Sequence, residues 1–183
     1  MFVRAGSRLS RRGFLAGMAA LAGSGLALRG LHGVHADDGD TVTVIVPDGI
    51  GADEHWVDVS LGQQVACAMT GGEITRVILA TSGQPGYETP TGQFRILYRV
   101  ANETMRSDSI GIPIDSPNGY DLDNVLWTQY FTDQGHALHD NYWRPLSVFG
   151  HTATSHGCVG MLEPDARFLW NFVGDGSLVN IHA

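Results

Sequence analysis

The feature that most constrains this chain is a series of short runs in which apolar and polar residues alternate, each bounded by turn formers such as Gly, Pro, Asn and Asp. In residues 55–60, Val57 and Val59 alternate with Trp56 and Asp58. A period of two places successive side chains on opposite faces of a β-strand, and the turn formers separate one strand from the next. The succession of such runs predicts one mainly β domain, built as a sheet sandwich or barrel.

The expected strands are short, and one clear helix follows near the end of the chain. Strands are expected at residues 41–46, 55–60, 64–69, 74–80, 94–99, 125–131, 135–139 and 177–181. Residues 82–92 contain too many turn formers for regular structure, so we expect an ordered loop there. At residues 163–165, Glu-Pro-Asp predicts the first turn of a helix, because Pro fits that turn and acidic side chains favour the positive end of the helix dipole. The fold class is therefore mainly β with one or two short helices.

The distribution of charge excludes several classes of partner. All eleven basic residues are arginines, and five of them precede residue 36, whereas all nineteen acidic residues follow it. The chain after residue 36 therefore has a formal net charge of −13, with six arginines against nineteen acidic residues. A body this acidic is a poor match for phosphate backbones or anionic membrane surfaces, and we expect no nucleic-acid partner.

Residues 1–36 are typical of an export signal. Arg11 and Arg12 precede an apolar run rich in Ala, Gly and Leu, and residues 34–36 offer a cleavage site. The arrangement resembles a twin-arginine (Tat) signal. An ordinary Sec signal and an uncleaved anchor are the alternatives, although the run of about 16 residues is shorter than the roughly 20 that a spanning helix needs. We expect export to the periplasm, cell wall or extracellular space, with residues 37–53 forming an N-terminal strand and lead-in.

The two cysteines lie in different sequence contexts. Cys67 shares a strand face with Val65 and Met69, which predicts a small buried side chain. Cys158 lies in a segment containing Gly and His, which is typical of a functional loop. Because oxidising compartments favour disulfides, a Cys67–Cys158 bridge is the alternative to a free Cys158 thiol.

Residues 136–158 concentrate the chemically active side chains. They hold four of the eight histidines and one of the two cysteines: His136, His139, His151, His156 and Cys158. A thiol becomes a nucleophile when an imidazole takes its proton, and successive N–H groups in a Gly-containing turn can face the resulting oxyanion. Residues 155–158, Ser-His-Gly-Cys, supply the thiol and the turn, and His139 at the end of an apolar run is the candidate base.

A metal site is the competing interpretation of the same residues. Structural zinc sites require a closed set of ligands, and His156 and Cys158 are too close in sequence to bind one ion readily with good angles. Neither Cys-x-x-Cys nor His-Glu-x-x-His occurs in the sequence. We therefore expect neither a metal nor another cofactor.

His139, followed after eighteen residues by Cys158 within Ser155-His156-Gly157-Cys158-Val159, resembles the signature of the L,D-transpeptidase (YkuD-type) catalytic domain. Further segments resemble that family in the same order, at residues 56–60, 81–83, 89–94, 126–131, 139–143 and 149–150. The resemblance covers roughly residues 54–182. It implies an L,D-transpeptidase-like β-sandwich or barrel, with residues 54–183 as the catalytic domain.

The resemblance implies that the substrate is peptidoglycan. Cys158 would attack the L,D-peptide bond of a tetrapeptide stem, release the terminal D-Ala and retain the stem as a thioester. An amine of a neighbouring stem would then resolve the thioester and cross-link the two stems. With water as the acceptor, the enzyme would be an L,D-carboxypeptidase. We expect a monomer whose partners are peptidoglycan stem peptides, with carbapenem-type β-lactams as covalent inhibitors.

Carried over residue by residue, the resemblance makes Cys158 the nucleophile, His139 the base and His156 the motif histidine that shapes the pocket. The N–H groups of Gly157 and Cys158 would face the oxyanion, and Ser155 would form a hydrogen bond within the loop. The family often uses the backbone carbonyl after the base to hold the imidazole.

Residues near the base are candidates for contact with the substrate. Asp140 follows the base, and its side chain is expected in solvent or against the substrate. Tyr142 and Trp143 are expected to touch a ligand, because amphipathic rings line many small-molecule clefts. His136 and His151 lie in hydrophilic stretches and have no role in the family, so we expect both to be polar loop residues.

The chain departs from the family pattern at Gly160, where many members carry Asn or Arg. The missing side chain bears on acceptor specificity and on transpeptidation itself. A non-catalytic wall-binding module on the same fold is therefore an alternative, since it would keep the cleft without needing a reactive thiol.

Overall fold

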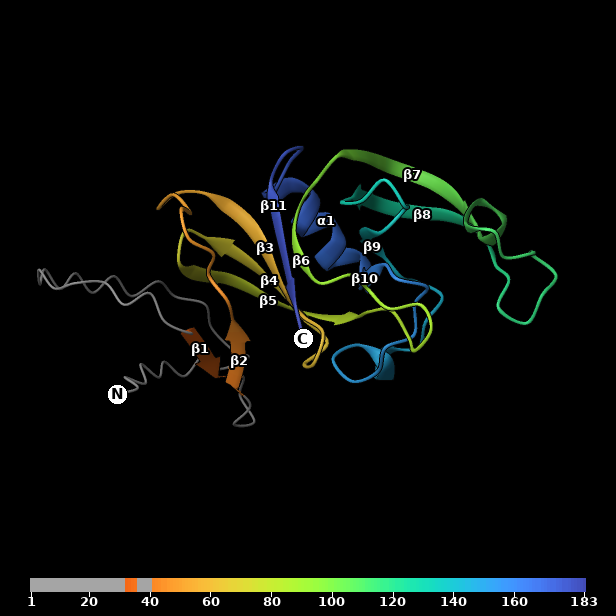
Figure 1. The fold of residues 1–183 in the computed structure, drawn as a ribbon, viewed down its shortest axis with the longest axis horizontal. Helices are drawn as coiled ribbons and strands as arrows, with labels where there is room; N and C mark the ends of the chain where they lie inside the picture. Colours follow the sequence, from red (N-terminus) through yellow and green to blue (C-terminus); the bar gives the residue numbers. More distant parts are fainter. Residues whose placement is uncertain (1–31, 36–40) are drawn as a thin grey trace, which may run out of the picture.

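The computed structural model of the chain describes residues 32–35 and 41–183 (Figure 1). The strands in these residues are β1 His32–His35, β2 Thr41–Val44, β3 His55–Ser60, β4 Val65–Thr70, β5 Glu73–Thr81, β6 Gly92–Arg95, β7 Tyr98–Arg106, β8 Asp121–Tyr130, β9 Ala137–Asp140, β10 Val159–Met161 and β11 Leu178–His182. The helices are α1 Glu163–Phe172 and the short 3-10 helices η1 Ser107–Ile110 and η2 Leu146–Val148. The expected mainly β fold, with its helix near the end of the chain, is confirmed.

Nine strands form one curled sheet in the order β6-β11-β3-β4-β5-β10-β9-β8-β7. Only two neighbouring pairs are parallel, β3 with β11 and β9 with β10. The two edge strands, β6 and β7, follow each other in the sequence. The Ile96 N–H donates to the Ser177 carbonyl beside β11, whereas the Leu97 N–H donates to the Tyr130 carbonyl at the end of β8. The chain thus passes from one edge of the sheet to the other between residues 96 and 97, which closes the curl.

The concave face of the sheet holds the main core. Helix α1 lies inside the curl and packs against β8 and β9 (Figure 1). Ala166 and Leu169 of this helix join a buried cluster that includes Leu138 of β9 and Val159 of β10. The main core therefore anchors β9, which contains His139, and β10, which directly follows Cys158.

Over β3 and β4, the opposite face of the sheet is covered by β2. Val42 and Val44 of β2 belong to a second buried cluster with Trp56, Cys67 and Met69. The expectation that Cys67 is buried is confirmed, and burial raises its pKa to about 12. Both cysteines are free thiols, so the alternative of a Cys67–Cys158 bridge is wrong.

Most expected strands lie close to observed ones, but the single strand expected at residues 94–99 is wrong. The chain changes sheet edge between residues 96 and 97 and pairs with a different strand on each side of that point. The sequence alternation persists across the break because Phe94 and Ile96 both pack into the main core.

Strands β7 and β8 project from the curl as a long hairpin, joined by residues 107–120 (Figure 1). No strand was expected for most of β7. Its residues, Tyr98–Arg106, are exposed or half-buried throughout, so they lack a buried face that would impose alternation.

The export signal expected at residues 1–36 lies mostly outside the described residues and stays a prediction. Strand β1 falls within it and pairs antiparallel with β2. Among the described residues, no helix has the length and apolar character needed to cross a membrane.

Candidate active site

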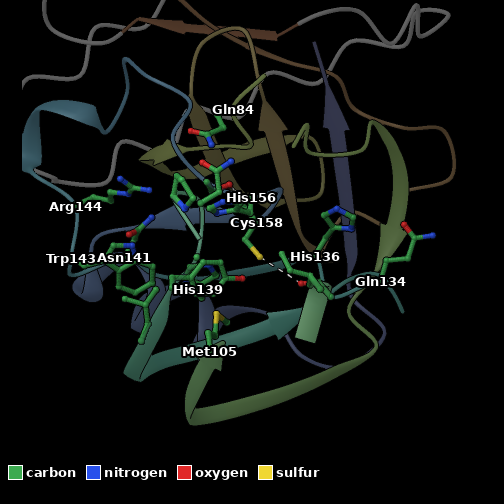
Figure 2. Close-up of a pocket in the computed structure, with 18 residues that line it drawn as sticks. Gln84, Met105, Gln134, His136, His139, Asn141, Trp143, Arg144, His156 and Cys158 are labelled. Carbon is green, nitrogen blue, oxygen red and sulfur yellow. Dashed lines mark hydrogen bonds between the residues drawn. The ribbon is translucent and has the colours of Figure 1, made fainter. Parts of the chain in front are cut away.

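A cleft of about 420 Å³ lies beside the β7–β8 hairpin, β9 and the loop before β10 (Figure 2). The residues that line it are Gln84, Met105, Ile110, Pro117, Asn118, Gly119, Tyr120, Leu122, Gln134, Gly135, His136, His139, Asn141, Trp143, Arg144, Ser155, His156 and Cys158. The structure thus brings the expected Cys158, His139 and His156 together in one cleft.

The parallel pairing of β9 with β10 places the thiol and the imidazole at neighbouring positions. Val159 lies opposite Leu138 and Gly160 opposite His139, so Cys158 directly precedes β10. Leu138 and Val159 point into the main core. Because successive side chains of a strand point to opposite faces, Cys158 and His139 face the cleft instead, as Figure 2 shows.

The loop before β10 has a geometry that requires glycine. Gly157 has φ +115°, and a Cβ at this position would lie 2.6 Å from Cδ2 of His136. Thr89 Oγ1 donates to the Gly157 carbonyl at 2.8 Å, and Ser155 Oγ donates to the Cys158 carbonyl at 2.6 Å. The Gly157 N–H itself donates to Ser155 Oγ at 3.1 Å. The hydrogen bond expected of Ser155 within the loop is present, whereas the oxyanion roles of the Gly157 and Cys158 N–H groups stay predictions.

The Cys158 thiol is protonated at neutral pH. Its Sγ donates to the Gly135 carbonyl at 3.5 Å. Burial, which penalises the thiolate, raises the pKa of Cys158 to about 11, although a backbone hydrogen bond from Ala137 partly opposes the shift. A thiol in this environment needs a base before it can act as a nucleophile.

The His139 imidazole is a neutral base held in one orientation. The side chain is 3% exposed, and burial lowers its pKa to about 4 because the imidazolium is disfavoured. Its Nδ1–H donates to the Asp140 carbonyl. The ring also stacks on Trp143, with centroids 5.8 Å apart. The Asp140 contact leaves Nε2 as the nitrogen that can accept a proton.

His156 lies between two tyrosine rings at the edge of the same cleft. Its ring centroid is 4.5 Å from that of Tyr87 and 5.2 Å from that of Tyr120. Burial lowers the pKa of His156, and the positive charge of Arg144 lowers it further. These contacts fit the expected role of His156 in shaping the pocket, while its effect on catalysis stays a prediction.

Two expected substrate contacts do not line the cleft. The Asp140 side chain is buried rather than solvated, and its carboxylate accepts the Leu126 N–H, which joins β9 to β8. Tyr142 is 56% exposed and donates its hydroxyl to the Asp123 carbonyl at 2.7 Å. The sequence alone could not show that Trp143 lines the cleft while Asp140 and Tyr142 do not, because side chains at adjacent positions of a short segment face different neighbours.

His136 lies in a loop, as expected, and its ring also lines the cleft and lies against Gly157. Its Nδ1 pairs with Thr132 Oγ1 at 2.8 Å, and burial lowers its pKa. His151, in contrast, is exposed and does not line the cleft.

Sequence reasoning also missed the wall supplied by the β7–β8 hairpin. Met105, Ile110 and Leu122 contribute apolar surface there, and Tyr120 adds a phenol whose pKa is raised to about 12 by burial and, less strongly, by Cys158. Residues 107–120 have no periodic pattern of apolar residues, so their contribution to the cleft wall could be recognised only from the structure.

Gly160 acquires a structural explanation. A Cβ at this position would lie 2.3 Å from Nδ2 of Asn141 and 2.9 Å from its Cβ. Asn141 is 2% exposed and lines the cleft. The Asn141 amide therefore fills the volume that a side chain at position 160 would occupy. The sequence did not reveal this packing, because the two residues belong to different segments of the chain.

Metal ligands are not grouped in the described part of the chain, where no three His, Cys, Asp or Glu side chains are placed to hold one ion. The chemistry that the cleft offers is that of a thiol, an imidazole base and hydrogen-bonding groups.

Comparison with known proteins agrees with this chemistry. The profile of the L,D-transpeptidase catalytic domain (YkuD) matches residues 54–181. The chain belongs to this family. Among curated L,D-transpeptidases, the probable L,D-transpeptidase 3 of Mycobacterium tuberculosis is 36% identical over 103 residues, which are 56% of this chain and 37% of that protein. The chain spans between 26% and 43% of the length of the curated relatives it matches.

Solved L,D-transpeptidases share the fold. The chain is similar to the LD transpeptidase LdtMt1 in complex with imipenem, with TM-score 0.68 and 26% identity over 71% of this chain and 59% of that one. It is also similar to L,D-transpeptidase 3 from Mycobacterium tuberculosis in complex with a faropenem-derived adduct, with TM-score 0.65 and 28% identity over 70% and 60% of the two chains.

Proposed function

We propose that this chain is a peptidoglycan L,D-transpeptidase whose Cys158 forms a thioester with a tetrapeptide stem and passes the stem to an amine acceptor. The observation that carries the proposal is that the pairing of β9 with β10 brings the His139 imidazole and the thiol of Cys158, which directly precedes β10, into one cleft. Relatives that match the chain are named L,D-transpeptidases, and one solved relative carries a faropenem-derived adduct.

The first half-reaction acylates the enzyme. The Cys158 sulfur attacks the carbonyl carbon before the terminal D-Ala while the thiol proton passes to Nε2 of His139. The S–C bond forms and the C–N bond breaks, and the imidazolium returns its proton to the D-Ala amine that leaves. Because the thiol and the imidazole both start neutral, no charge is stored in the buried site before the substrate arrives.

The second half-reaction transfers the stem. The acceptor amine attacks the thioester carbonyl and gives a proton to His139. The new C–N bond forms, the C–S bond breaks, and the thiolate recovers its proton from the imidazolium. Water in place of the amine would release a shortened stem, which is the carboxypeptidase outcome.

Export belongs to the same proposal. Peptidoglycan lies outside the cytoplasm, and residues 1–36 resemble a twin-arginine signal. The acidic remainder of the chain, without a basic surface, fits work on a peptide rather than on nucleic acid.

Product masses test the proposal directly. The protein without residues 1–36 is incubated with a purified tetrapeptide stem, with and without an amine acceptor, and Cys158→Ala is the control. The expected products are D-Ala and a cross-linked dimer, together with a carbapenem adduct on the peptide that carries Cys158. A shortened stem alone would indicate a carboxypeptidase. The absence of product and adduct from a reduced protein would contradict the proposal and favour a binding module.

A further inference from the structure

The cleft contains one permanently charged side chain. Of the residues that line it in the described part of the chain, only Arg144 carries a fixed charge, and none is Asp or Glu. The remainder of the protein is strongly acidic, with a net charge of −8 for the whole chain. A lone cation in a cleft without acidic side chains, on an acidic protein, favours a negatively charged group of the substrate at that place.

Arg144 is held in position but is not neutralised. Its Nη2 donates to the Thr154 carbonyl at 2.7 Å, which ties the guanidinium to the loop that leads to Cys158. The ion pairs formed by described residues do not include Arg144. Since a guanidinium has five N–H donors, most of its donors remain for another group.

Asn141 adds a second polar group at the same end of the cleft. Figure 2 shows the side chains of Asn141 and Arg144 close together in the view, and the backbone N–H of Arg144 donates to the backbone carbonyl of Asn141 at 3.3 Å. The amide of Asn141 lies over Gly160, where no side chain competes for the space.

Unsatisfied polar atoms are concentrated in these residues. In the described part of the chain, six buried side-chain nitrogen or oxygen atoms have no hydrogen-bond partner, and three of them are Asn141 Oδ1, Arg144 Nε and His156 Nε2. Such atoms are rare in folded proteins and are expected where a ligand completes the hydrogen bonding. This observation is independent of the charge argument and indicates the same end of the cleft.

We propose that Arg144, assisted by Asn141, binds the terminal carboxylate of the donor stem. This assignment rests on the proposed function. In the proposed reaction the leaving D-Ala carries a free carboxylate two bonds from the nitrogen of the scissile bond. A guanidinium that is fixed to the loop before Cys158 and lines the same cleft matches a carboxylate with two parallel N–H donors. The subsite selects stems whose peptide chain ends directly after the scissile bond.

The test compares two donors that differ only in this charge. One is a tetrapeptide stem with a free terminal carboxylate, and the other is the same stem with a terminal carboxamide. Release of D-Ala or its amide gives kcat/KM for each donor. We expect the wild-type protein to prefer the carboxylate donor by about 10- to 100-fold, the range for a hydrogen bond to a charged group.

Variants assign the preference to named residues. Arg144→Gln lowers kcat/KM for the carboxylate donor by about 10- to 100-fold more than it lowers kcat/KM for the carboxamide donor. Arg144→Lys keeps the positive charge without the two parallel N–H donors. Its kcat/KM for the carboxylate donor should lie between those of the wild-type protein and Arg144→Gln. Asn141→Asp, which is nearly isosteric, also lowers turnover of the carboxylate donor. Arg167→Gln, which removes an exposed arginine of α1 outside the cleft, leaves the preference intact.

The outcomes separate the subsite from the proposed function. Equal wild-type kcat/KM for the two donors, or an equal loss for both in Arg144→Gln, would overturn the subsite alone. Measurable turnover of the carboxamide donor shows that the variant is folded. Failure of the wild-type protein to turn over either donor would contradict the proposed function and the subsite with it.

Discussion

The Cys158 thiol and the His139 imidazole are each unfavourable to ionise where the fold places them. Burial raises the pKa of the thiol to about 11 and lowers that of the imidazole to about 4. A thiolate–imidazolium pair is therefore not the resting state, in contrast to cysteines whose pKa is lowered by a neighbouring cation. In the proposed reaction, proton transfer must therefore accompany the attack, which couples substrate binding to activation of the nucleophile.

Substitution of the two cysteines should separate chemistry from stability. Cys158→Ala abolishes thioester formation and leaves the fold intact, because the loop residue contributes no side chain to either core. Cys67→Ala lowers the free energy of unfolding by about 1 to 2 kcal/mol and spares turnover, since Cys67 packs in the second cluster. Urea unfolding and a turnover assay of both variants check this, and equal loss of activity in the two would contradict it.

His139 should make the protein sensitive to acid. Burial depresses the pKa of His139 in the folded protein to about 4, below the ordinary value of 6.5. The free energy of unfolding is therefore highest above pH 6.5 and falls as the pH drops from 6.5 through about 4. We expect about 3 kcal/mol to be lost over that window. In His139→Gln this part of the pH dependence disappears. Urea unfolding across the window measures both proteins, and parallel curves would show that His139 is not responsible.

At the scale of elements, the β9–β10 pair determines the site, and Gly160 with Asn141 is its tightest point. Gly160→Ala should cost about 1 to 3 kcal/mol, because its Cβ would overlap the Asn141 amide. In the Asn141→Gly background the same change should cost little, giving a coupling energy of about 1 to 2 kcal/mol. Thermal or urea unfolding of the four proteins completes the cycle. Additive effects would contradict the packing described.

The same elements explain what the sequence could and could not predict. That His139 and Cys158 would share one cleft was predictable, because Cys158 lies in a short Ser-His-Gly-Cys motif and His139 precedes it at a spacing that resembles the family signature. Asn141 was not, since its role depends on the parallel register that brings it over Gly160. The hairpin wall was missed because most of β7 lacks a buried face, and His136 because its contact with Gly157 crosses more than twenty residues of sequence.

At the scale of the whole molecule, the alternation of apolar residues was sufficient for the mainly β class, and Glu-Pro-Asp at residues 163–165 was sufficient for the position of α1. It was not sufficient for the closure of the sheet. The alternation that includes Phe94 and Ile96 continues through the point where the chain passes from one sheet edge to the other. The pattern therefore predicts a single strand. Closure of the sheet depends on which strand accepts the hydrogen bond from each N–H group, and this pairing is a property of the folded sheet.

Export should depend on the paired arginines rather than on charge alone. Arg11→Lys with Arg12→Lys keeps both positive charges and should block translocation, because a twin-arginine signal is recognised by a receptor. Fractionation of cells that produce the variant and the wild-type chain measures the exported share. Unchanged export would favour the Sec route instead.

The lead-in should be part of the folding unit and not a detachable linker. Val44 of β2 is fully buried against the second face of the sheet, whereas Ile45 is 43% exposed. Hydrogen bonds hold the same segment: the side chain of Gln63 donates to the Thr41 carbonyl at 2.7 Å and accepts the Thr43 N–H at 2.8 Å.

Val44→Ala should therefore lower the free energy of unfolding by about 2 kcal/mol, from two lost methyl groups and the cavity they leave. Ile45→Ala is the matched control and should change it by less than about 0.5 kcal/mol. Because none of the residues that line the cleft belongs to this cluster, both variants should form the Cys158 thioester at the wild-type rate. Urea unfolding with a turnover assay decides the point: equal stability of the two variants would mean that β2 rests on the sheet without contributing to its core.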